Sequence, residues 1–215
     1  MNPLFTAEEI IFATGGTPRG ITDLSISVSS VSTDTRTSMP NALFIALSGE
    51  NFDAHNYLRE AIAQGAAILC IEQSKQHLLP AEAPAILVQS TLKAMQDLAH
   101  FHRMRFPDLR VIALTGSCGK TSTKETLRAI FQYAFEEDQV LYTQGNTNNQ
   151  IGVPQNLLKL EKHHRFAILE MGTNHPGEIE PLARCAQPDA ALIVSIARCH
   201  LEFLGSLEGV AREKQ

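Results

Sequence analysis

A glycine-rich loop between a β-strand and a helix constrains the fold of this chain more than any other feature of its sequence. Residues 110–115 form an apolar run typical of a strand, residues 116–119 contain two glycines, and Lys120 and Thr121 begin a helical pattern. Glycines allow backbone N–H groups to converge on phosphate oxygens, and a helix N-terminus adds partial positive charge. We therefore expect a phosphate-binding loop between a strand and a helix of a parallel sheet.

The residue types in this loop favour ATP with Mg²⁺ as the ligand. The Lys120 ammonium can reach the β- and γ-phosphates, and the Thr121 hydroxyl can bind the metal. Leu114 stands where the usual motif has its first glycine, so a glycine turn without a ligand is the alternative. Cys118 is either a tolerated small residue or a regulatory thiol at the helix N-terminus. The expected ATP-binding residues of the loop are Thr115, Gly116, Ser117, Cys118, Gly119, Lys120, Thr121 and Ser122.

Strands and helices alternate around the loop, which is typical of a parallel α/β sheet. Strands are predicted at residues 110–115, 140–143, 165–171 and 190–196. Helices are predicted at residues 91–104, 120–135, 152–160 and 177–185. We assign residues 85–215 to one central ATP-binding domain.

The residues before this domain predict a smaller, mixed α/β domain over residues 1–84. A helix is expected at residues 6–13, where Thr6 and Glu9 have the spacing of a capping box. A second helix is expected at residues 56–64, and strands are expected at 25–32, 42–47 and 67–71. The Pro-, Glu- and Ala-rich stretch 80–84 is the predicted boundary, and a strand at 85–88 follows it.

Polar side chains follow three more strands of the predicted parallel sheet. Glu170 ends an apolar strand, where a buried carboxylate requires a partner, and Mg²⁺ is a suitable one. His200 follows the last strand, and Asn146, Asn148 and Asn149 follow the strand after the loop helix. Ligands of open parallel sheets gather at the carboxyl ends of the strands, so these residues are candidates for one site. A salt-bridged core glutamate, a solvated histidine and turn-forming asparagines are the alternatives.

Composition argues against several other classes of function. The net charge of −5 gives no indication of a nucleic-acid surface or a polybasic membrane patch. The sequence begins without a signal-peptide pattern, and no apolar stretch is long enough to span a membrane. The four cysteines contain no C-x-x-C pair, so zinc and redox spacing are absent. We expect a cytoplasmic protein with free thiols.

The last residues begin a helix that has no closing signal. The helical pattern starts at Ser206 and continues to Gln215, and neither a C-cap glycine nor another strand follows it. A natural domain rarely ends in this way. We therefore expect an incomplete central domain in a fragment of a longer protein.

Four segments of the second part resemble, in order, sequence blocks of the Mur ligases. The loop at residues 115–125 is similar to theirs, including the missing first glycine, and the other blocks are residues 145–154, 170–179 and 200–214. The Asn-His-Pro-Gly-Glu-Ile sequence at 174–179 resembles the MurF branch, whereas the MurE branch has a Ser-Ser-His version. In the first part, residues 32–36 and 43–55 are similar to the uridine-nucleotide domain of the MurF branch.

The resemblance implies an ATP-dependent ligase that adds D-alanyl-D-alanine to UDP-N-acetylmuramoyl-tripeptide in peptidoglycan precursor synthesis. The reaction would proceed through an acyl phosphate, which the amine of the dipeptide attacks. The implied catalytic residues are Lys120, Glu170, His200 and Lys214, the last of them carbamoylated. The implied magnesium ligands are Thr121, Glu170, His200 and Lys214. The residues that it adds to the ATP site are Asn146 and Asn149.

For the first part, the resemblance implies a site for the uridine diphosphate sugar. Ala54 and Asn41 depart from the usual glycine and aspartate of the MurF pattern in this region. Arg36 is the strongest candidate, because a guanidinium suits a diphosphate. The implied substrate-binding residues are Asp34, Thr35, Arg36, Gly49, Asp53 and His55.

The resemblance also implies a C-terminal domain that this chain lacks and a monomeric full enzyme. We therefore expect negligible ligase activity from the chain alone. One alternative is a stand-alone nucleotide-binding module without ligase turnover. Others are a MurE-type ligase and a folylpolyglutamate synthase, although the first 80 residues argue against the latter.

Overall fold

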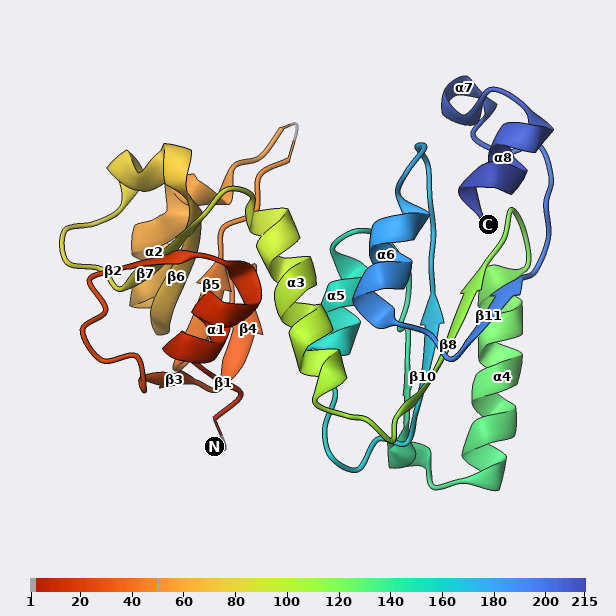
Figure 1. Cartoon of the computed structure of the whole chain (residues 1–215), viewed down its shortest axis with the longest axis horizontal. Coiled ribbons are helices and arrows are strands. Elements are labelled where there is room, and N and C mark those ends of the chain that lie inside the picture. The colour runs from red at the N-terminus through yellow and green to blue at the C-terminus, as the bar shows by residue number, and fades with distance from the viewer. Residues whose placement is uncertain (1–2, 50) are drawn as a thin grey trace. The chain divides into compact units, whose positions relative to one another are not determined.

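In the computed structural model, which describes residues 3–49 and 51–215, the chain forms two compact units. The first unit extends to Leu98 and the second begins at Ala99 (Figure 1). This division differs from the predicted boundary after residue 84, because the strand at 85–88 pairs with two strands of the first unit. Each unit contains strands and helices, so the predicted α/β class is confirmed. Glu50, which belongs to the block at 43–55, lies outside the described residues.

The first unit is built on a five-stranded sheet in the order β2-β7-β6-β5-β4. Its strands are β2 (Thr17–Arg19), β7 (Ala85–Val88), β6 (Ala66–Glu72), β5 (Ala42–Ile45) and β4 (Ser30–Ser32). The β2 strand is antiparallel to β7, and the other pairs are parallel. A 3₁₀ helix (Ala54–Tyr57) and α2 (Leu58–Ala63) supply Ala54, Leu58 and Ala61 to a core that also contains Phe44 and Leu69. A second 3₁₀ helix (Gln73–Leu78) follows β6.

The start of the first unit confirms one local prediction and corrects another. The α1 helix (Ala7–Thr14) begins with the predicted capping box between Thr6 and Glu9. The predicted single strand at 25–32 is two strands, β3 (Ser27–Val28) and β4. The β3 strand pairs with β1 (Phe5–Thr6) in a separate sheet, and β4 joins the main sheet.

The second unit is built on a parallel sheet in the order β11-β8-β10-β9. Its strands are β8 (Arg110–Thr115), β9 (Val140–Tyr142), β10 (Phe166–Glu170) and β11 (Ala190–Ile193). Side chains alternate between the faces: Val111 and Ala113 pack in one core, and Leu114 packs with Ile168 in the other. The helices include α3 (Thr91–Met104, which crosses from the first unit), α4 (Lys120–Ala134), α5 (Gly152–Leu157) and α6 (Ile179–Ala186).

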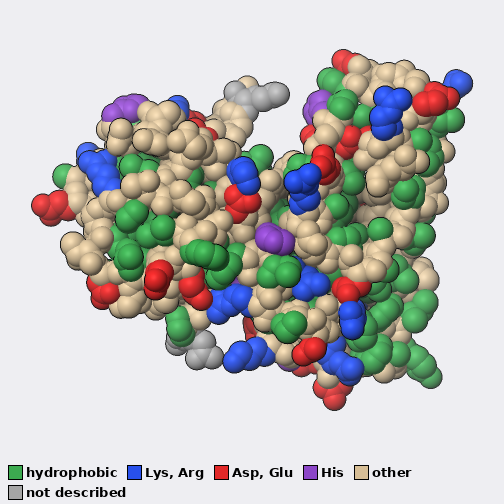
Figure 2. All heavy atoms as spheres, viewed as in Figure 1, with side chains coloured by type: hydrophobic (Ala, Val, Ile, Leu, Met, Phe, Trp, Pro, Cys, Tyr) green, Lys and Arg blue, Asp and Glu red, His purple; other side chains and the backbone are tan. Residues whose placement is uncertain are grey.

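The α4 helix lies on one face of this sheet, and α5 and α6 lie on the other (Figure 1). Hydrophobic side chains are also exposed along α4 (Figure 2). Among them, Ile130 is 56% exposed and Tyr133 is 95% exposed. The strand predicted at 190–196 ends at Ile193. The residues of β11 are all exposed, and this strand lies at the edge of the sheet.

The last elements of the chain are α7 (Leu201–Leu204), which the sequence did not predict, and α8 (Leu207–Glu213), which lies within the helix predicted from Ser206 to Gln215. Ser206 caps α8 by accepting a hydrogen bond from the Gly209 N–H. A short 3₁₀ helix (Glu137–Gln139) precedes β9. The four cysteines are free thiols, and burial raises the pKa of Cys70 to about 12. Across residues 3–49 and 51–215, the structure contains no helix with the length and hydrophobicity that a membrane span requires.

Candidate functional site

The glycine loop connects the carboxyl end of β8 to the first turn of α4, as the sequence predicts. Gly119 directly precedes α4 with a φ of 81°, a left-handed conformation that favours glycine. The Lys120 Nζ donates a hydrogen bond of 2.8 Å to the Gly116 carbonyl oxygen, so the ammonium lies over the loop. The first turn of a helix also leaves N–H groups without helical partners. This arrangement suits a phosphate group.

The loop is bound to the segment that follows β11. The Ser117 N–H donates to the Ser195 carbonyl oxygen over 3.0 Å, and the Cys118 N–H donates to the Ser195 Oγ over 2.9 Å. The Ala197 N–H and the Cys199 thiol both donate to the Ser117 Oγ, over 3.0 and 3.2 Å. These contacts hold the two loops together at the carboxyl edge of the sheet. No feature of the sequence indicated that Ser195 contacts the phosphate loop.

Glu170, the last residue of β10, lies against the phosphate loop and is only 2% exposed. Its Oε2 accepts a hydrogen bond of 3.1 Å from the Thr121 hydroxyl, and its Oε1 accepts one of 2.9 Å from the Asn148 amide. Within the described part of the chain, this carboxylate has no ion pair with a Lys, Arg or His. A buried negative charge beside a hydroxyl is an oxygen donor set that suits Mg²⁺.

Of the three asparagines after β9, the structure brings Asn148 to Glu170. The Asn149 Oδ1 instead accepts from two backbone N–H groups at the start of α5, over 3.2 and 2.9 Å. Asn146 is exposed, and its side chain makes no hydrogen bond to any described residue. Neither Asn146 nor Asn149 has a side-chain hydrogen bond to the phosphate loop among the described residues, and their contacts to ATP stay a prediction. Asparagines favour caps and turns, and only the tertiary structure distinguishes the three.

Lys214 follows α8 directly and is 4% exposed. Burial lowers the pKa of its ammonium, and the nearby Lys120 ammonium lowers that pKa further, against the opposing effect of Cys199. Lys214 lines a cavity of about 80 Å³ together with Thr115 and Met171. The structure therefore places this lysine close to the phosphate loop, in a setting that favours the neutral amine.

Among the described residues, no hydrogen bond or ion pair joins His200 to Glu170. His200 is exposed, precedes α7 with a φ of 50°, and has a side chain without a hydrogen bond to the described residues. In the sequence, both residues follow or end strands of the same parallel sheet. However, β11 already ends at Ile193, and a further segment lies between the end of β11 and His200. The expected metal role of His200 stays a prediction.

A cavity of about 490 Å³ in the first unit is lined by Asp34, Thr35 and Arg36. The Arg36 Nη2 lies 2.6 Å from the Asp34 Oδ2, and hydrogen bonds from Arg36 lower the pKa of Asp34 to about 2. The Arg36 side chain is 87% exposed, so its guanidinium remains accessible to an anion. Phe52 and Tyr57 stack with ring centroids 5.4 Å apart and add an aromatic wall. Three of the predicted substrate-binding residues, Asp34, Thr35 and Arg36, therefore line one cavity.

Two other predicted substrate-binding residues, Asp53 and His55, are occupied by internal contacts. His55 is 1% exposed; its Nδ1 lies 2.6 Å from the Asp53 Oδ1, and its Nε2 accepts the Glu72 N–H over 3.0 Å. Asp53 also accepts hydrogen bonds from the Ser48 hydroxyl and the Lys75 ammonium, over 3.0 and 2.9 Å. These contacts fix the turn between β5 and α2. They leave His55 no free ring nitrogen for a ligand.

The same contacts determine the charge of Asp53. Burial acts to raise its pKa, but hydrogen bonds from Lys75, His55 and Ser48 outweigh burial and hold the pKa below its ordinary value. Gly49, another predicted substrate residue, is exposed in this turn, where its N–H donates to the Phe52 carbonyl oxygen over 2.7 Å. A substrate contact at Gly49 stays a prediction.

The sequence did not indicate that one lysine of α4, the helix after the phosphate loop, is buried. Lys124 is 1% exposed, and its Nζ donates a hydrogen bond of 2.8 Å to the Thr143 carbonyl oxygen. The Thr143 hydroxyl in turn accepts the Glu170 N–H over 3.0 Å. Lys124 therefore supports the strand end that carries Glu170. A lysine in a helix ordinarily indicates a solvated face, so the sequence offered no signal for this role.

Two family models match the chain. The model described as the Mur ligase family, catalytic domain, matches residues 27–103. The model described as the Mur ligase middle domain matches residues 114–215.

Curated relatives match along most of the chain. A UDP-N-acetylmuramoyl-tripeptide–D-alanyl-D-alanine ligase of Haemophilus influenzae is 45% identical over 195 residues, which are 90% of this chain and 42% of that protein. The ligase of the same name from Escherichia coli is 44% identical over 189 residues, which are 88% of this chain and 40% of that protein. The chain thus spans about two fifths of the length of these relatives.

Solved structures agree with the sequence matches. A crystal structure of MurF from Acinetobacter baumannii has a TM-score of 0.90 and 36% identity, and the match covers 100% of this chain and 46% of that one. A crystal structure of MurF ligase from Thermotoga maritima in complex with ADP has a TM-score of 0.78 and 29% identity. That match covers 87% of this chain and 42% of the other.

Proposed function

The chain belongs to the MurF branch of the Mur ligase family, and from this premise we propose that it carries the uridine-nucleotide and ATP sites of a D-alanyl-D-alanine-adding ligase. The proposed acceptor is UDP-N-acetylmuramoyl-tripeptide, and the proposed setting is peptidoglycan precursor synthesis in the cytoplasm. The observation that carries the proposal is the contact between buried Glu170 and Thr121 of the phosphate loop. The ADP complex of the similar Thermotoga maritima protein supports ATP as the nucleotide.

The proposed reaction has two steps. A carboxylate oxygen of the tripeptide bonds to the γ-phosphorus while the bond from that phosphorus to ADP breaks, which gives an acyl phosphate. The dipeptide amine then bonds to the acyl carbon, inorganic phosphate leaves and the amine loses a proton. Both partners of the first step are anionic, so the site has to neutralise negative charge. Lys120, which lies over the loop, is the residue of this chain that would do so at the phosphates.

Magnesium would supply further neutralisation of the phosphate charge when it is bound. Thr121 and Glu170 are the residues that would hold it, because a buried carboxylate without a cationic partner among the described residues adjoins a hydroxyl. Lys214 is the proposed carbamoylated lysine, because burial favours its neutral amine and a carbamate would reverse the sign of its charge. His200 is the further proposed ligand, and its side chain makes no hydrogen bond to the described residues.

In the first unit, the cavity of about 490 Å³ would receive the uridine diphosphate group. Arg36 is the proposed contact to the diphosphate because its guanidinium is exposed at the cavity. Asp34 orients that guanidinium through the ion pair, and Thr35 also lines the cavity. The partners of this protein would thus be small molecules, with a monomer as the proposed state of the enzyme.

Binding measurements on this chain test the proposal. Isothermal titration calorimetry with ATP and Mg²⁺, and separately with UDP-N-acetylmuramoyl-tripeptide, should show one site for each. Binding is the suitable readout because the chain spans only about two fifths of its relatives, and we expect negligible dipeptide-dependent phosphate release from it. A folded chain that binds neither ligand would contradict the proposal. Binding of ATP without binding of the uridine nucleotide would contradict the substrate assignment alone.

A further inference from the structure

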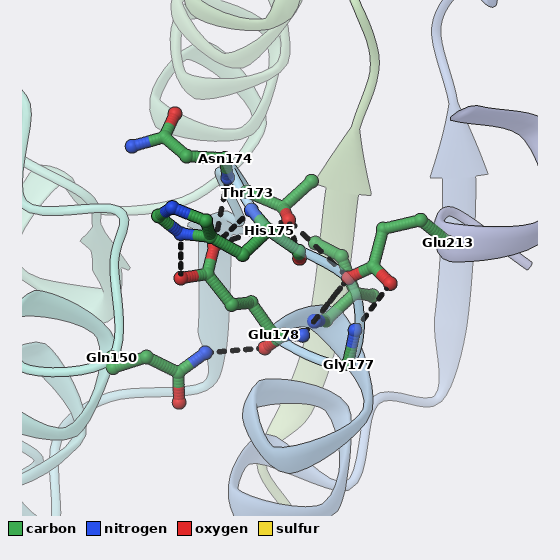
Figure 3. A network of polar contacts seen from close by, with 8 residues as sticks. Gln150, Thr173, Asn174, His175, Gly177, Glu178 and Glu213 are labelled. Atoms are coloured by element: carbon green, nitrogen blue, oxygen red, sulfur yellow. Dashed lines mark hydrogen bonds and ion pairs between the residues drawn. The ribbon is translucent and has the colours of Figure 1, made fainter. Parts of the chain in front are cut away.

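The carboxylate of Glu213, in the last turn of α8, is bound to the start of α6 (Figure 3). Its Oε2 accepts a hydrogen bond of 2.6 Å from the Gly177 N–H. Its Oε1 accepts hydrogen bonds of 2.9 Å from the Glu178 and Ile179 N–H groups. It also lies 3.2 Å from the Thr173 hydroxyl, whose one proton has a closer acceptor in the His175 carbonyl oxygen, at 2.8 Å. One side chain therefore joins two segments that lie far apart in the sequence.

The loop that receives Glu213 is itself held in place. The Glu178 carboxylate accepts hydrogen bonds from the N–H groups of Asn174 and His175, over 2.7 and 3.1 Å, and lies 3.1 Å from the His175 Nδ1 (Figure 3). Gln150 donates to the Glu178 carbonyl oxygen, and the His175 ring lies 4.2 Å from the Phe203 ring. These contacts hold in place the loop to which Glu213 of α8 is hydrogen-bonded.

The hydrogen bonds of Glu213 are of a kind that depends on its negative charge. Among residues 3–49 and 51–215, Glu213 has no ion pair with a cationic side chain, and its donors are backbone N–H groups at a helix start. Such N–H groups favour a carboxylate because the helix N-terminus carries partial positive charge. Removal of the carboxylate would leave several donors of α6 without this acceptor.

The residue after Glu213 is Lys214, which is 4% exposed beside the phosphate loop. Because the two are adjacent on one turn, fixing one side chain restricts where the other can lie. We propose that Glu213 is a positioning residue that anchors the end of α8 to α6 and thereby holds the Lys214 amine beside the phosphate loop. The catalytic importance of Lys214 rests on the proposed function, but the anchoring does not.

Competitive acetylation of the whole chain, followed by peptide mass spectrometry, tests the anchoring. Two lysines serve as internal references: Lys93, with a side chain 72% exposed, and Lys124, which is 1% exposed in the same unit as Lys214. In the unchanged chain, Lys214 should react far more slowly than Lys93. In Glu213→Ala, the Lys214 rate should rise about tenfold while the Lys124 rate stays constant, because only the last turn is released. Glu208→Ala, on the same helix, should leave all three rates unchanged.

Conservative variants separate positioning from a general loss of structure. Glu213→Gln keeps one acceptor oxygen, so its Lys214 rate should lie between those of the unchanged chain and Glu213→Ala. If Glu213→Ala raises the Lys124 rate as well, the unit has opened, and the milder Glu213→Gln then decides by a smaller rise at Lys214 alone. A Lys214 rate that stays within twofold of the original in both Glu213→Ala and Glu213→Gln overturns the proposal. ATP titrations of the same samples report separately on the proposed function.

Discussion

The two candidate sites differ in what their polar residues are bonded to. In the second unit, Glu170 is bonded to neutral groups of Thr121 and Asn148 and has no cationic partner among the described residues, so it can still accept a cation. In the first unit, His55 and Asp53 are bonded to each other and to the surrounding turn. A polar residue in a motif can therefore serve the turn rather than the ligand. The hydrogen-bond partners of such a residue in the structure show whether it stabilises a turn or is available to a ligand.

Loss of the loop ammonium should have the largest effect on the nucleotide site. Lys120→Ala should weaken ATP binding about 100-fold, because a charge-assisted contact to phosphate is lost. The thermal stability of this variant should change little, since the one hydrogen bond of the ammonium within the described residues goes to the Gly116 carbonyl oxygen. Isothermal titration calorimetry measures the affinity, and Lys159→Ala, at an exposed position, is the control. If the two variants bind ATP with equal affinity, the loop is not part of the ATP site.

The part of this site that the sequence could predict depends on local structure. The strand, glycine turn and helix of the phosphate loop follow from neighbouring residues, and the predicted bounds of β8 agree with the structure. Glu170 was placed correctly because a parallel sheet brings its strand ends to one edge.

The residues that the sequence could not assign depend on contacts between distant segments. Asn148 and Asn149 are neighbours with the same side chain, yet one reaches Glu170 and the other caps α5. Glu213 contacts Gly177 across 36 positions, a pairing that no local pattern encodes. His55 was expected to contact substrate because the motif contained it, whereas its burial against Glu72 was not visible in the sequence.

The contrast between the sites predicts a stability effect at Asp53. Asp53→Asn should lower the free energy of unfolding of the first unit by about 2 kcal/mol, because hydrogen bonds to the Lys75 ammonium and to His55 are weakened. Urea unfolding measures this change. Asp97→Asn, which breaks an i,i+4 ion pair with Lys93, is the control and should change stability by less than about 0.5 kcal/mol. If Asp53→Asn lowers the affinity for the uridine nucleotide but not the stability, Asp53 contacts the substrate rather than stabilising the turn.

The pH dependence of the first unit follows from the same carboxylate. The pKa of Asp53 is lower in the folded chain than its ordinary value, so the folded state binds fewer protons than the unfolded state. Its stabilising contribution is complete above the ordinary carboxyl pKa and is lost as the pH falls towards the lowered value. Asp53→Asn should therefore flatten the acid limb of the stability curve. An unchanged acid limb in this variant would contradict the assigned hydrogen bonds.

A smaller effect on the nucleotide site should come from Glu170, because it acts through the metal. Glu170→Gln should weaken ATP binding about tenfold when Mg²⁺ is present, since an anionic oxygen ligand is replaced by a neutral one. Without Mg²⁺ the affinity should stay the same or rise, because a negative charge near the phosphates is removed. Glu180→Gln, in an exposed pair with Arg184, is the control. The same magnesium dependence in both variants would show that Glu170 holds no metal.

The smallest effect should come from Arg36, which is the exposed counterpart of Lys120 in the first unit. Arg36→Ala should weaken uridine diphosphate binding about fivefold, because an exposed guanidinium contributes modestly against solvent. The urea midpoint should not move, since the Arg36 contacts are made with Asp34 at the surface. Hydrogen bonds from Arg36 hold the Asp34 pKa at about 2, so the variant should return that pKa towards 3.8 in an NMR titration. If the Asp34 pKa returns but the nucleotide affinity does not change, the ion pair belongs to the turn, as the Asp53–His55 pair does. The first unit would then contain no predicted charged residue that is free for a ligand.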